Sequence, residues 1–329
     1  MDITDSQTKK ILVAIPAKNE ESTILDVVNN IKVFTKNSND LEYSIVVFND
    51  GSTDGTKKIL EEQNINVFTI KKSFGLGNVF SQITNYSLEN NFDILLTMDG
   101  DGQFTPEDIS KILKPILKNE AEMVTGSRFL KDSKTINISA IKKIGNEVGA
   151  KYISSVLKER FYDVTCGFRA YTKEAILRVH TFSDFTYTQE VFLNLGFKKL
   201  IIKEVPITTT YFAGRKSKMV KSVLSYILKS LKIILKSILV YSPMKLFGGL
   251  GFVAFMVTIA SGVFIIFWNK ATGSVTPFKW VGVTATVSAI TGVILYCVGI
   301  LLQITSRLQI TAEEQLYLTK KNIYGKRKY

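Results

Sequence analysis

Apolar residues in the N-terminal part of the chain follow two alternating patterns, short continuous runs and longer stretches with helical spacing. The short runs predict strands at Ile11–Ile15, Tyr43–Phe48, Asn66–Ile70, Asp93–Met98 and Glu122–Thr125. The longer stretches predict helices at Glu20–Phe34, Asp54–Gln63, Leu76–Leu88 and Pro106–Leu117. Strands that alternate with helices indicate an α/β fold, with a mixed, mainly parallel sheet covered by helices on both faces. In such sheets ligands bind at the carboxyl ends of the strands.

Two long runs without any charged residue follow this region, Leu246–Trp268 and Trp280–Ile304. Each exceeds the roughly 20 residues needed to cross the apolar core of a bilayer. Basic residues gather before the first run and after the second, whereas the connector Asn269–Lys279 holds only two lysines. The positive-inside rule then predicts a multi-pass protein of the cytoplasmic membrane, with the N-terminal domain and both termini in the cytoplasm. The alternative is a pair of buried core helices.

Lysines and apolar residues of Lys221–Tyr241 fall mostly on separate faces of a predicted helix. A basic amphipathic helix of this kind suits a membrane surface, although an ordinary surface helix would show the same pattern. The chain is thus predicted to have four parts: an α/β domain at 1–219, an amphipathic juxtamembrane region at 220–245, a transmembrane hairpin at 246–304 and a basic cytoplasmic tail at 305–329. Small residues in the first span are compatible with a homo-oligomer through the transmembrane helices.

Composition and charge narrow the class of partner. Of the 329 residues, 46% are hydrophobic and 22% are charged, which excludes a disordered chain. The chain has 42 Lys and Arg against 29 Asp and Glu, a formal net charge of +13. This excess predicts a polyanionic neighbour, such as nucleic acid, an anionic membrane face or a phosphate-bearing substrate. Nucleic acid is the weakest of these, because the basic residues crowd beside the predicted spans.

Polar residues follow four of the predicted strands. They are Pro16–Glu20 after the first strand, Asn49–Gly55 after the second, Asp99–Gln103 after the fourth and Gly126–Arg128 after the fifth. Each stretch by itself is compatible with turn chemistry. Because the four converge on one edge of the predicted sheet, they are better explained as a binding site.

Asp99 and Asp101 are the sharpest local signal in the chain. Residues two apart in extended backbone point the same way, so both carboxylates, with Gln103 beside them, can face one point. Like charges this close repel each other unless a cation lies between them. A few hard oxygen ligands suit Mg²⁺ or Mn²⁺, with phosphates of a substrate completing the coordination. The alternative is a solvated turn before the helix that follows Pro106.

With these residues in place, the chain resembles the family 2 glycosyltransferases with a GT-A, Rossmann-like fold. Within that family it is similar to the membrane-anchored polyprenyl-phosphate sugar synthases of bacteria and archaea, the dolichyl-phosphate mannose synthase group. The resemblance covers roughly Ile11 to Met219. The matching segments are Ile15–Glu20, Asn49–Ser52, Gly75–Gly77, Met98–Gln103, Gly126–Arg128, Gly167–Arg169 and Gly214–Lys218. Any one of them is a weak signal, but their order and spacing together are specific.

The resemblance implies roles for individual residues. The nucleotide would be held by Pro16, Ala17, Asn19, Glu20, Asp50 and Asp99. The metal would be bound by Asp99, Asp101 and Gln103, and the acceptor phosphate by Arg128, Lys142, Lys143, Arg169 and Ser217. Arg215 and Lys218 would close over the phosphates, and they count with Asp101, Arg128 and Glu190 as the catalytic set.

Two positions depart from the family pattern. Asn49 stands where an Asp is common, which should weaken only an outer contact with the nucleotide. Lys142 and Lys143 stand where an arginine for the acceptor is expected. A lysine keeps the charge but loses the two-pronged hydrogen bonding of a guanidinium.

The resemblance implies an inverting, metal-dependent transfer of a sugar from UDP-hexose or GDP-mannose to a polyprenyl phosphate at the cytoplasmic membrane face. A phosphate monoester is largely ionised at neutral pH, so no strong general base is required. Two alternatives stay open: a transferase acting on a lipid or polysaccharide hydroxyl, with Glu190 as base, and a non-catalytic membrane-binding module. A processive polysaccharide synthase would show a Gln-x-x-Arg-Trp signature, which the sequence lacks.

Overall fold

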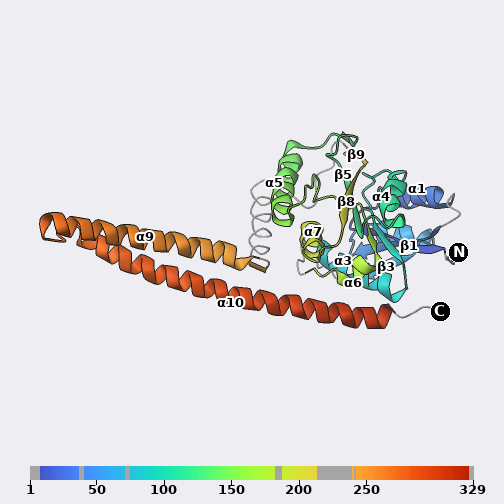
Figure 1. Cartoon of the computed structure of the whole chain (residues 1–329). Helices are drawn as coiled ribbons and strands as arrows, with labels where there is room; N and C mark the ends of the chain where they lie inside the picture. The colour runs from blue at the N-terminus through green and yellow to red at the C-terminus, as the bar shows by residue number, and fades with distance from the viewer. Residues whose placement is uncertain are drawn as a thin grey trace. The chain divides into compact units, whose positions relative to one another are not determined.

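The computed structural model describes residues 8–36, 41–70, 75–181, 187–212, 239–240 and 242–325 (Figure 1). The chain forms two compact units. One consists of Met1–Ser230 together with Leu316–Tyr329, and the other of Leu231–Gln315. The first unit holds the sheet and its helices, and the second holds two long apolar helices.

The first unit is built on a seven-stranded sheet. Its strands are β1 (Lys9–Ala17), β2 (Leu41–Asp50), β3 (Val67–Ile70), β4 (Ile94–Thr97), β5 (Met123–Ser127), β7 (Arg169–Thr172) and β8 (Ile202–Pro206), in the order β3-β2-β1-β4-β7-β5-β8. Every neighbouring pair is parallel except those made by β7, which runs antiparallel to both β4 and β5. A second sheet pairs β6 (Lys134–Ile136) with β9 (Thr208–Thr210).

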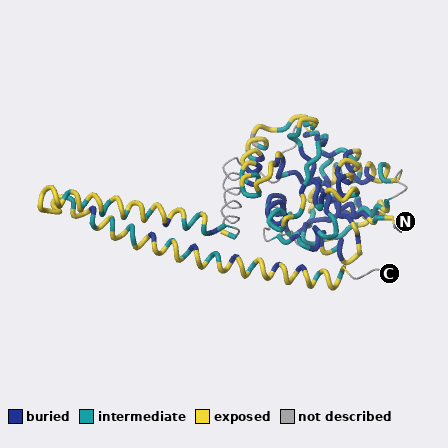
Figure 2. Tube along the Cα trace, viewed as in Figure 1, coloured by how far each residue is buried: buried dark blue, intermediate teal, exposed yellow. Residues whose placement is uncertain are grey.

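Helices cover both faces of the large sheet. They are α1 (Ile24–Lys36), α2 (Thr56–Glu62), α3 (Leu76–Glu89), α4 (Asp108–Leu117), α5 (Ala140–Leu157), α6 (Lys173–Arg178) and α7 (Thr188–Phe197). Alternate residues of β1, including Ile11 and Val13, join α1 and α4 in one core cluster, while α3 and α6 contact the sheet as well. The central strands are buried on both faces (Figure 2). This explains why their sequences read as continuous apolar runs rather than alternating ones.

The second unit contains α9 (Pro243–Thr272) and the larger part of α10 (Lys279–Tyr324). Both helices are long and apolar enough to cross a membrane, and only 6% and 11% of their most apolar stretches are buried. Soluble core helices would be mostly buried, so these are candidate membrane spans. Small residues bring the two backbones close together: a Cβ atom on Gly251 would lie 3.2 Å from the carbonyl oxygen of Gly292, and Ser288 donates a hydrogen bond to the carbonyl of Ala254 (2.7 Å).

The last turns of α10 belong to the first unit. Tyr317 is buried there, and its hydroxyl donates a hydrogen bond to Glu174 (2.9 Å). The guanidinium carbon of Arg178 lies over the Tyr317 ring, 4.2 Å from the centre of that ring. Part of the segment expected to be a tail, 305–324, is therefore helical and in part packed on the α/β domain.

The structure confirms the GT-A-like α/β architecture and each of the five strands expected from the apolar runs, with ends that differ by a few residues. The short strands β6, β7, β8 and β9 were not expected individually, because their runs are brief and β7 is paired only with distant segments. Most of the expected amphipathic region 220–245 lies outside the described residues.

Candidate active site

Two loops interlock at the carboxyl ends of β1 and β2. The backbone N–H of Asn19 donates to Ser52 Oγ (3.0 Å), and Asn19 Oδ1 accepts from the N–H of Thr53 (2.8 Å). The N–H of Glu20 donates to Thr56 Oγ1 (2.8 Å). Asn19 has a φ of 56°, a left-handed conformation that asparagine tolerates better than most residues. These bonds fix the loops that carry the expected nucleotide-binding residues, and Asn19 links the two loops through hydrogen bonds of its backbone and its side chain.

The loop after β4 carries the acidic pair. Asp101 Oδ1 accepts the backbone N–H of Gln103 (3.1 Å), and Gly102 between them has a φ of 75°. Thr23 on the first loop donates to the carbonyl of Gly100 (3.0 Å). The turn is thus held in a defined shape, beside the loop that follows β1, with Asp99 and Asp101 both partly exposed.

Asp99 rests directly on Gly167, the residue two positions before β7. A Cβ atom added to Gly167 would lie 2.9 Å from each carboxylate oxygen of Asp99. Burial, followed by the charge of nearby Asp101, raises the pKa of Asp99 to about 7, against the opposing charges of Arg128 and Arg169. A carboxylate whose pKa is raised by the charge of a second carboxylate lies close enough to it for the two to share one cation.

Arg128, the residue after β5, is held in place by Asp163. Its Nε donates to Asp163 Oδ2 (2.6 Å) and its Nη2 to Asp163 Oδ1 (2.8 Å) and to Thr165 Oγ1 (2.7 Å). Asp163 is fully buried, and its own backbone N–H donates to Glu204 (2.7 Å). The guanidinium therefore has a fixed position and orientation.

Tyr211 connects Arg128 with Lys142. Its hydroxyl accepts a hydrogen bond from Arg128 Nη1 (2.7 Å), and Lys142 Nζ lies 4.5 Å from the centre of its ring. Burial and the charge of Arg128 lower the pKa of Lys142, while the charge of Asp101 opposes this change. Arg128, Lys142 and Asp101 are thus near neighbours, and a cationic pair stands beside the acidic loop.

The structure places the other expected residues differently. Lys143 is exposed on α5, whereas Arg169 is fully buried and donates to the backbone carbonyls of Thr188 (2.8 Å) and Val164 (3.1 Å). This environment favours a supporting role for Arg169 over a contact with an acceptor. Glu190 is half-buried in the first turn of α7. Arg215, Ser217 and Lys218 lie outside the described residues.

Tyr211, Asp163 and Thr165 contact Arg128 in the candidate site and were not predicted from the sequence. Tyr211 follows the three-residue strand β9, and Asp163 lies in a loop 35 positions after Arg128. No local pattern links them to Arg128. The sequence offered one signal, namely that the acidic residue Asp163 lies close to the Gly167–Arg169 segment. An acidic residue in such a position is common and does not by itself indicate a site.

The donor set fits a divalent cation with substrate ligands. Asp99, Asp101 and the amide of Gln103 offer hard oxygen atoms on one short turn. In the described part of the chain no group of three His, Cys, Asp or Glu residues is arranged to hold a metal. Two carboxylates leave most coordination positions open, as is usual for Mg²⁺ bound together with phosphates.

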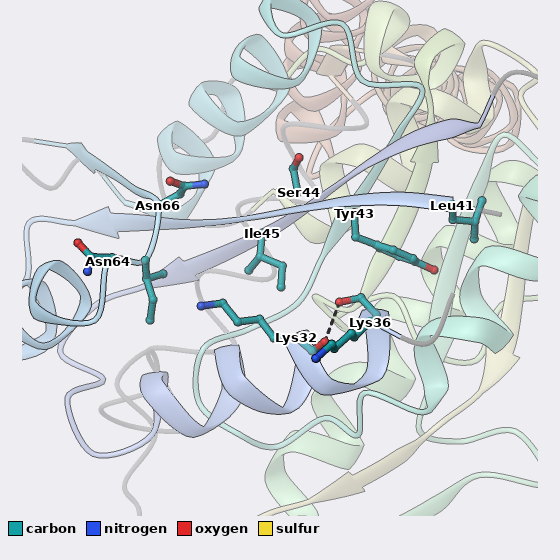
Figure 3. A pocket seen from close by; sticks show the side chains of 10 residues that line it. Lys32, Lys36, Leu41, Tyr43, Ser44, Ile45, Asn64 and Asn66 are labelled. Carbon is teal, nitrogen blue, oxygen red and sulfur yellow. Dashed lines mark hydrogen bonds between the residues drawn. The ribbon is translucent and has the colours of Figure 1, made fainter. Parts of the chain in front are cut away.

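A hollow among the described residues lies away from this edge of the sheet (Figure 3). It has a volume of about 450 Å³ and is lined by the end of α1 and the first half of β2, including Lys32, Lys36 and Tyr43. The first half of β2 is at the opposite edge of the sheet from Asp50. Because ligands of such sheets bind at the carboxyl edge, this hollow is not the candidate active site.

Comparison with known proteins agrees with the fold and with the family resemblance. The family model for glycosyl transferase family 2 matches residues 12–179, about half of the chain. The chain belongs to this family and is a glycosyltransferase.

Named relatives share most of their length with this chain. It is 34% identical over 227 residues to the UDP-N-acetylglucosamine–dolichyl-phosphate N-acetylglucosaminyltransferase of Methanococcus voltae, covering 62% of this chain and 86% of that protein. It is 26% identical to the polyprenol monophosphomannose synthase of Mycolicibacterium smegmatis, covering 62% and 78%. These relatives, by their names, transfer sugars to polyprenyl phosphates.

Among solved structures, glucosyl-3-phosphoglycerate synthase from Mycobacterium tuberculosis, determined with Mn²⁺ and UDP-glucose, has the same fold. The TM-score is 0.52 at 18% identity, covering 69% of this chain and 79% of that chain. At this identity the likeness shows the GT-A fold alone.

Proposed function

We propose that this protein transfers a sugar from a nucleotide diphosphate to a polyprenyl phosphate at the cytoplasmic face of a membrane. The observation that carries the proposal is the juxtaposition of the acidic loop Asp99–Gln103 with the cationic pair of Arg128 and Lys142. One side of the site suits a metal–diphosphate, and the other suits a phosphate monoester. The names of the polyprenyl-phosphate relatives support the same acceptor class.

The donor would lie over the loops after β1, β2 and β4. Glu20 and Asp50 are buried beside Pro16 and Ala17, and the interlocked turns hold them at the sheet edge. Asp99, Asp101 and Gln103 would hold Mg²⁺ or Mn²⁺. When bound, this cation would neutralise the diphosphate as it leaves.

The acceptor phosphate would lie against Arg128 and Lys142. Its oxygen attacks the anomeric carbon of the sugar from the face opposite the diphosphate, so a carbon–oxygen bond forms as the bond to the diphosphate breaks, and the configuration inverts. The second pKa of a phosphate monoester is about 6, so the attacking oxygen carries no proton at neutral pH. The role left to this chain's cations is to bring two anions together and to orient the acceptor.

The acceptor also explains the apolar helices. A polyprenyl chain lies in the bilayer with its phosphate at the surface, and a nucleotide sugar is supplied from the cytoplasm. We therefore propose that α9 and α10 cross the membrane and that the α/β unit and both termini are cytoplasmic, in agreement with the distribution of basic residues. Arg215, Ser217 and Lys218 remain proposed phosphate contacts.

The test is a donor screen with the full chain in membranes. UDP- and GDP-sugars are offered together with a short polyprenyl phosphate, with and without Mg²⁺ or Mn²⁺, and an acid-labile glycolipid is the expected product. Asp101→Asn should abolish product formation while the protein stays in the membrane. A matched reaction with the free polyprenol decides the acceptor: sugar transfer to the alcohol alone would overturn the proposal and favour Glu190 as a base.

A further inference from the structure

Helix α5 carries an apolar stripe on its outer side. With about 3.6 residues per turn, Ile144 and Val148 lie one above the other on a helix. Ile144 is 61% exposed and Val148 is 53% exposed, whereas Ala150 and Ile153 on the other side of α5 are buried. The helix therefore has two apolar faces, and only one of them is covered by the domain.

A charged stripe runs beside the exposed apolar one. Lys143 and Glu147 are exposed on one flank of Ile144, and Lys151, which pairs with Glu147 (2.9 Å), is exposed about two turns further along, nearly in line with Ile144. The segment 140–160 holds five basic residues and two acidic ones. Apolar side chains flanked by lysines match the boundary between the acyl chains and anionic head groups of a bilayer.

The position of α5 links this surface to the site. The helix begins with Ser139 as its cap, whose Oγ accepts from the N–H of Lys142, and Lys142 reaches the ring of Tyr211 at the candidate active site. The same polypeptide carries two candidate membrane spans, and a bilayer that holds them would offer this face an apolar partner.

We infer that the outer face of α5, defined by Ile144, Val148 and the neighbouring Lys143, docks on the lipid surface of the bilayer. This inference does not depend on sugar transfer. It assigns to the α/β unit its own membrane contact, separate from the two apolar helices.

The test uses full-length protein in nanodiscs. The exposed Cys297 is replaced by Ser so that it does not react with the dye, whereas the buried Cys166 is kept. The environment-sensitive dye NBD is attached to Ile144→Cys or Val148→Cys. Controls carry it at Lys58→Cys on α2, which is highly exposed, and at Val33→Cys, an exposed apolar residue on α1. An apolar helix face inserts to about 5–10 Å at the head-group boundary, so shallow doxyl-labelled lipids should quench the α5 dyes about twofold or more and leave both controls unchanged.

Two further arms separate lipid from other occupants. Adding Ile144→Asp to the Val148→Cys protein should reduce the quenching, and Lys143→Glu should reduce it in anionic but not in neutral nanodiscs. A blue-shifted dye that doxyl lipids do not quench would mean that protein covers the face, and would overturn the inference. A dye at residue 144 that is as water-exposed as that at residue 58 would also overturn it. Sugar transfer measured on the same samples reports separately on the proposed function.

Discussion

Asp163 binds Arg128 through two parallel hydrogen bonds, from Nε to Oδ2 (2.6 Å) and from Nη2 to Oδ1 (2.8 Å). Asp163 also accepts the backbone N–H of Arg128 (3.0 Å). Burial disfavours a charged Asp163, but the charge and hydrogen bonds of Arg128 outweigh this and keep its pKa below the usual value. The pair is therefore charged at neutral pH and aims the remaining face of the guanidinium towards Tyr211.

Replacing Asp163 by Asn should destabilise the protein and weaken acceptor binding. Removing one partner of a buried ion pair leaves the other charge uncompensated, which typically costs about 3–5 kcal/mol. The free energy of unfolding is measured in detergent by thermal and denaturant unfolding, and the KM for polyprenyl phosphate is measured on the folded fraction. Glu120→Gln, which breaks an exposed pair with Lys203, is the control and should change little. Equal effects of the two substitutions would contradict the assignment.

Lys142 and Lys143 are adjacent in the chain but differ in their environment, so they provide a matched pair of variants. Losing a charge-assisted contact typically costs about 1.5–3 kcal/mol, or roughly ten- to a hundredfold in kcat/KM. Lys142→Ala should show this loss for the phosphate acceptor, whereas Lys143→Ala should retain near-normal kcat/KM in neutral nanodiscs. Lys142→Arg should restore much of the activity. A larger loss for Lys143 would place the acceptor elsewhere.

The affinity for a divalent cation should depend on pH because of Asp99. Its pKa of about 7 means that binding a cation must displace a proton below that pH. Mn²⁺ affinity of the chelator-treated protein, followed by calorimetry, should rise as the pH approaches 7 and level off above it. Asp101→Asn removes the neighbouring charge, so it should weaken binding and flatten the pH dependence. A pH-independent affinity in the parent protein would contradict this expectation.

The metal-free protein should show the opposite trend in stability. The raised pKa of Asp99 means that the folded state favours the protonated carboxyl group. The stabilisation of the folded state by this group is fully present below the pKa of the unfolded chain and is lost as the pH rises through about 7. Thermal unfolding in the presence of chelator should therefore occur at lower temperature as the pH increases over that interval, and saturating Mn²⁺ should reverse the change.

Gly167→Ala should impair catalysis without unfolding the protein. The added methyl group would meet both carboxylate oxygens of Asp99 at 2.9 Å, so the carboxylate must move. Displacement of a catalytic group by about 1 Å can cost on the order of a hundredfold in rate. Gly262→Ala, where a Cβ atom meets nothing within 4 Å, is the control and should retain activity. Normal metal affinity and rate in Gly167→Ala would show that Asp99 has room to adjust.

The sequence was sufficient to predict the acidic loop and the edge of the sheet to which it belongs. Asp99 and Asp101 follow a buried strand, and residues at the carboxyl ends of parallel strands converge whatever their separation in the chain. The predicted strands rested on continuous apolar runs, which arise because β1 and β4 are buried on both faces.

The partners of Arg128 could not be predicted in the same way. Asp163 reaches it from a loop that Glu204 and Asn146 fix through side-chain bonds to its backbone, and Tyr211 reaches it from the end of a three-residue strand. Arg169 illustrates the converse problem. An arginine beside a glycine suggests a ligand contact, yet its position in β7, between Thr97 and Thr125 of the neighbouring strands, puts its guanidinium in the interior.

Strand β7, which runs antiparallel to its two neighbours, sets the distance between the turn that carries Asp99 and the residue Arg128. Because it lies between β4 and β5, the turn that carries Asp99 and the residue Arg128 emerge two strand widths apart, roughly 10 Å at about 4.8 Å for each pair of neighbouring strands. Had β4 and β5 been neighbours, the acidic loop and Arg128 would have emerged only one strand width apart. Under the proposed function, the separation by two strand widths would keep the departing diphosphate, held by the acidic loop, apart from the attacking phosphate beside Arg128.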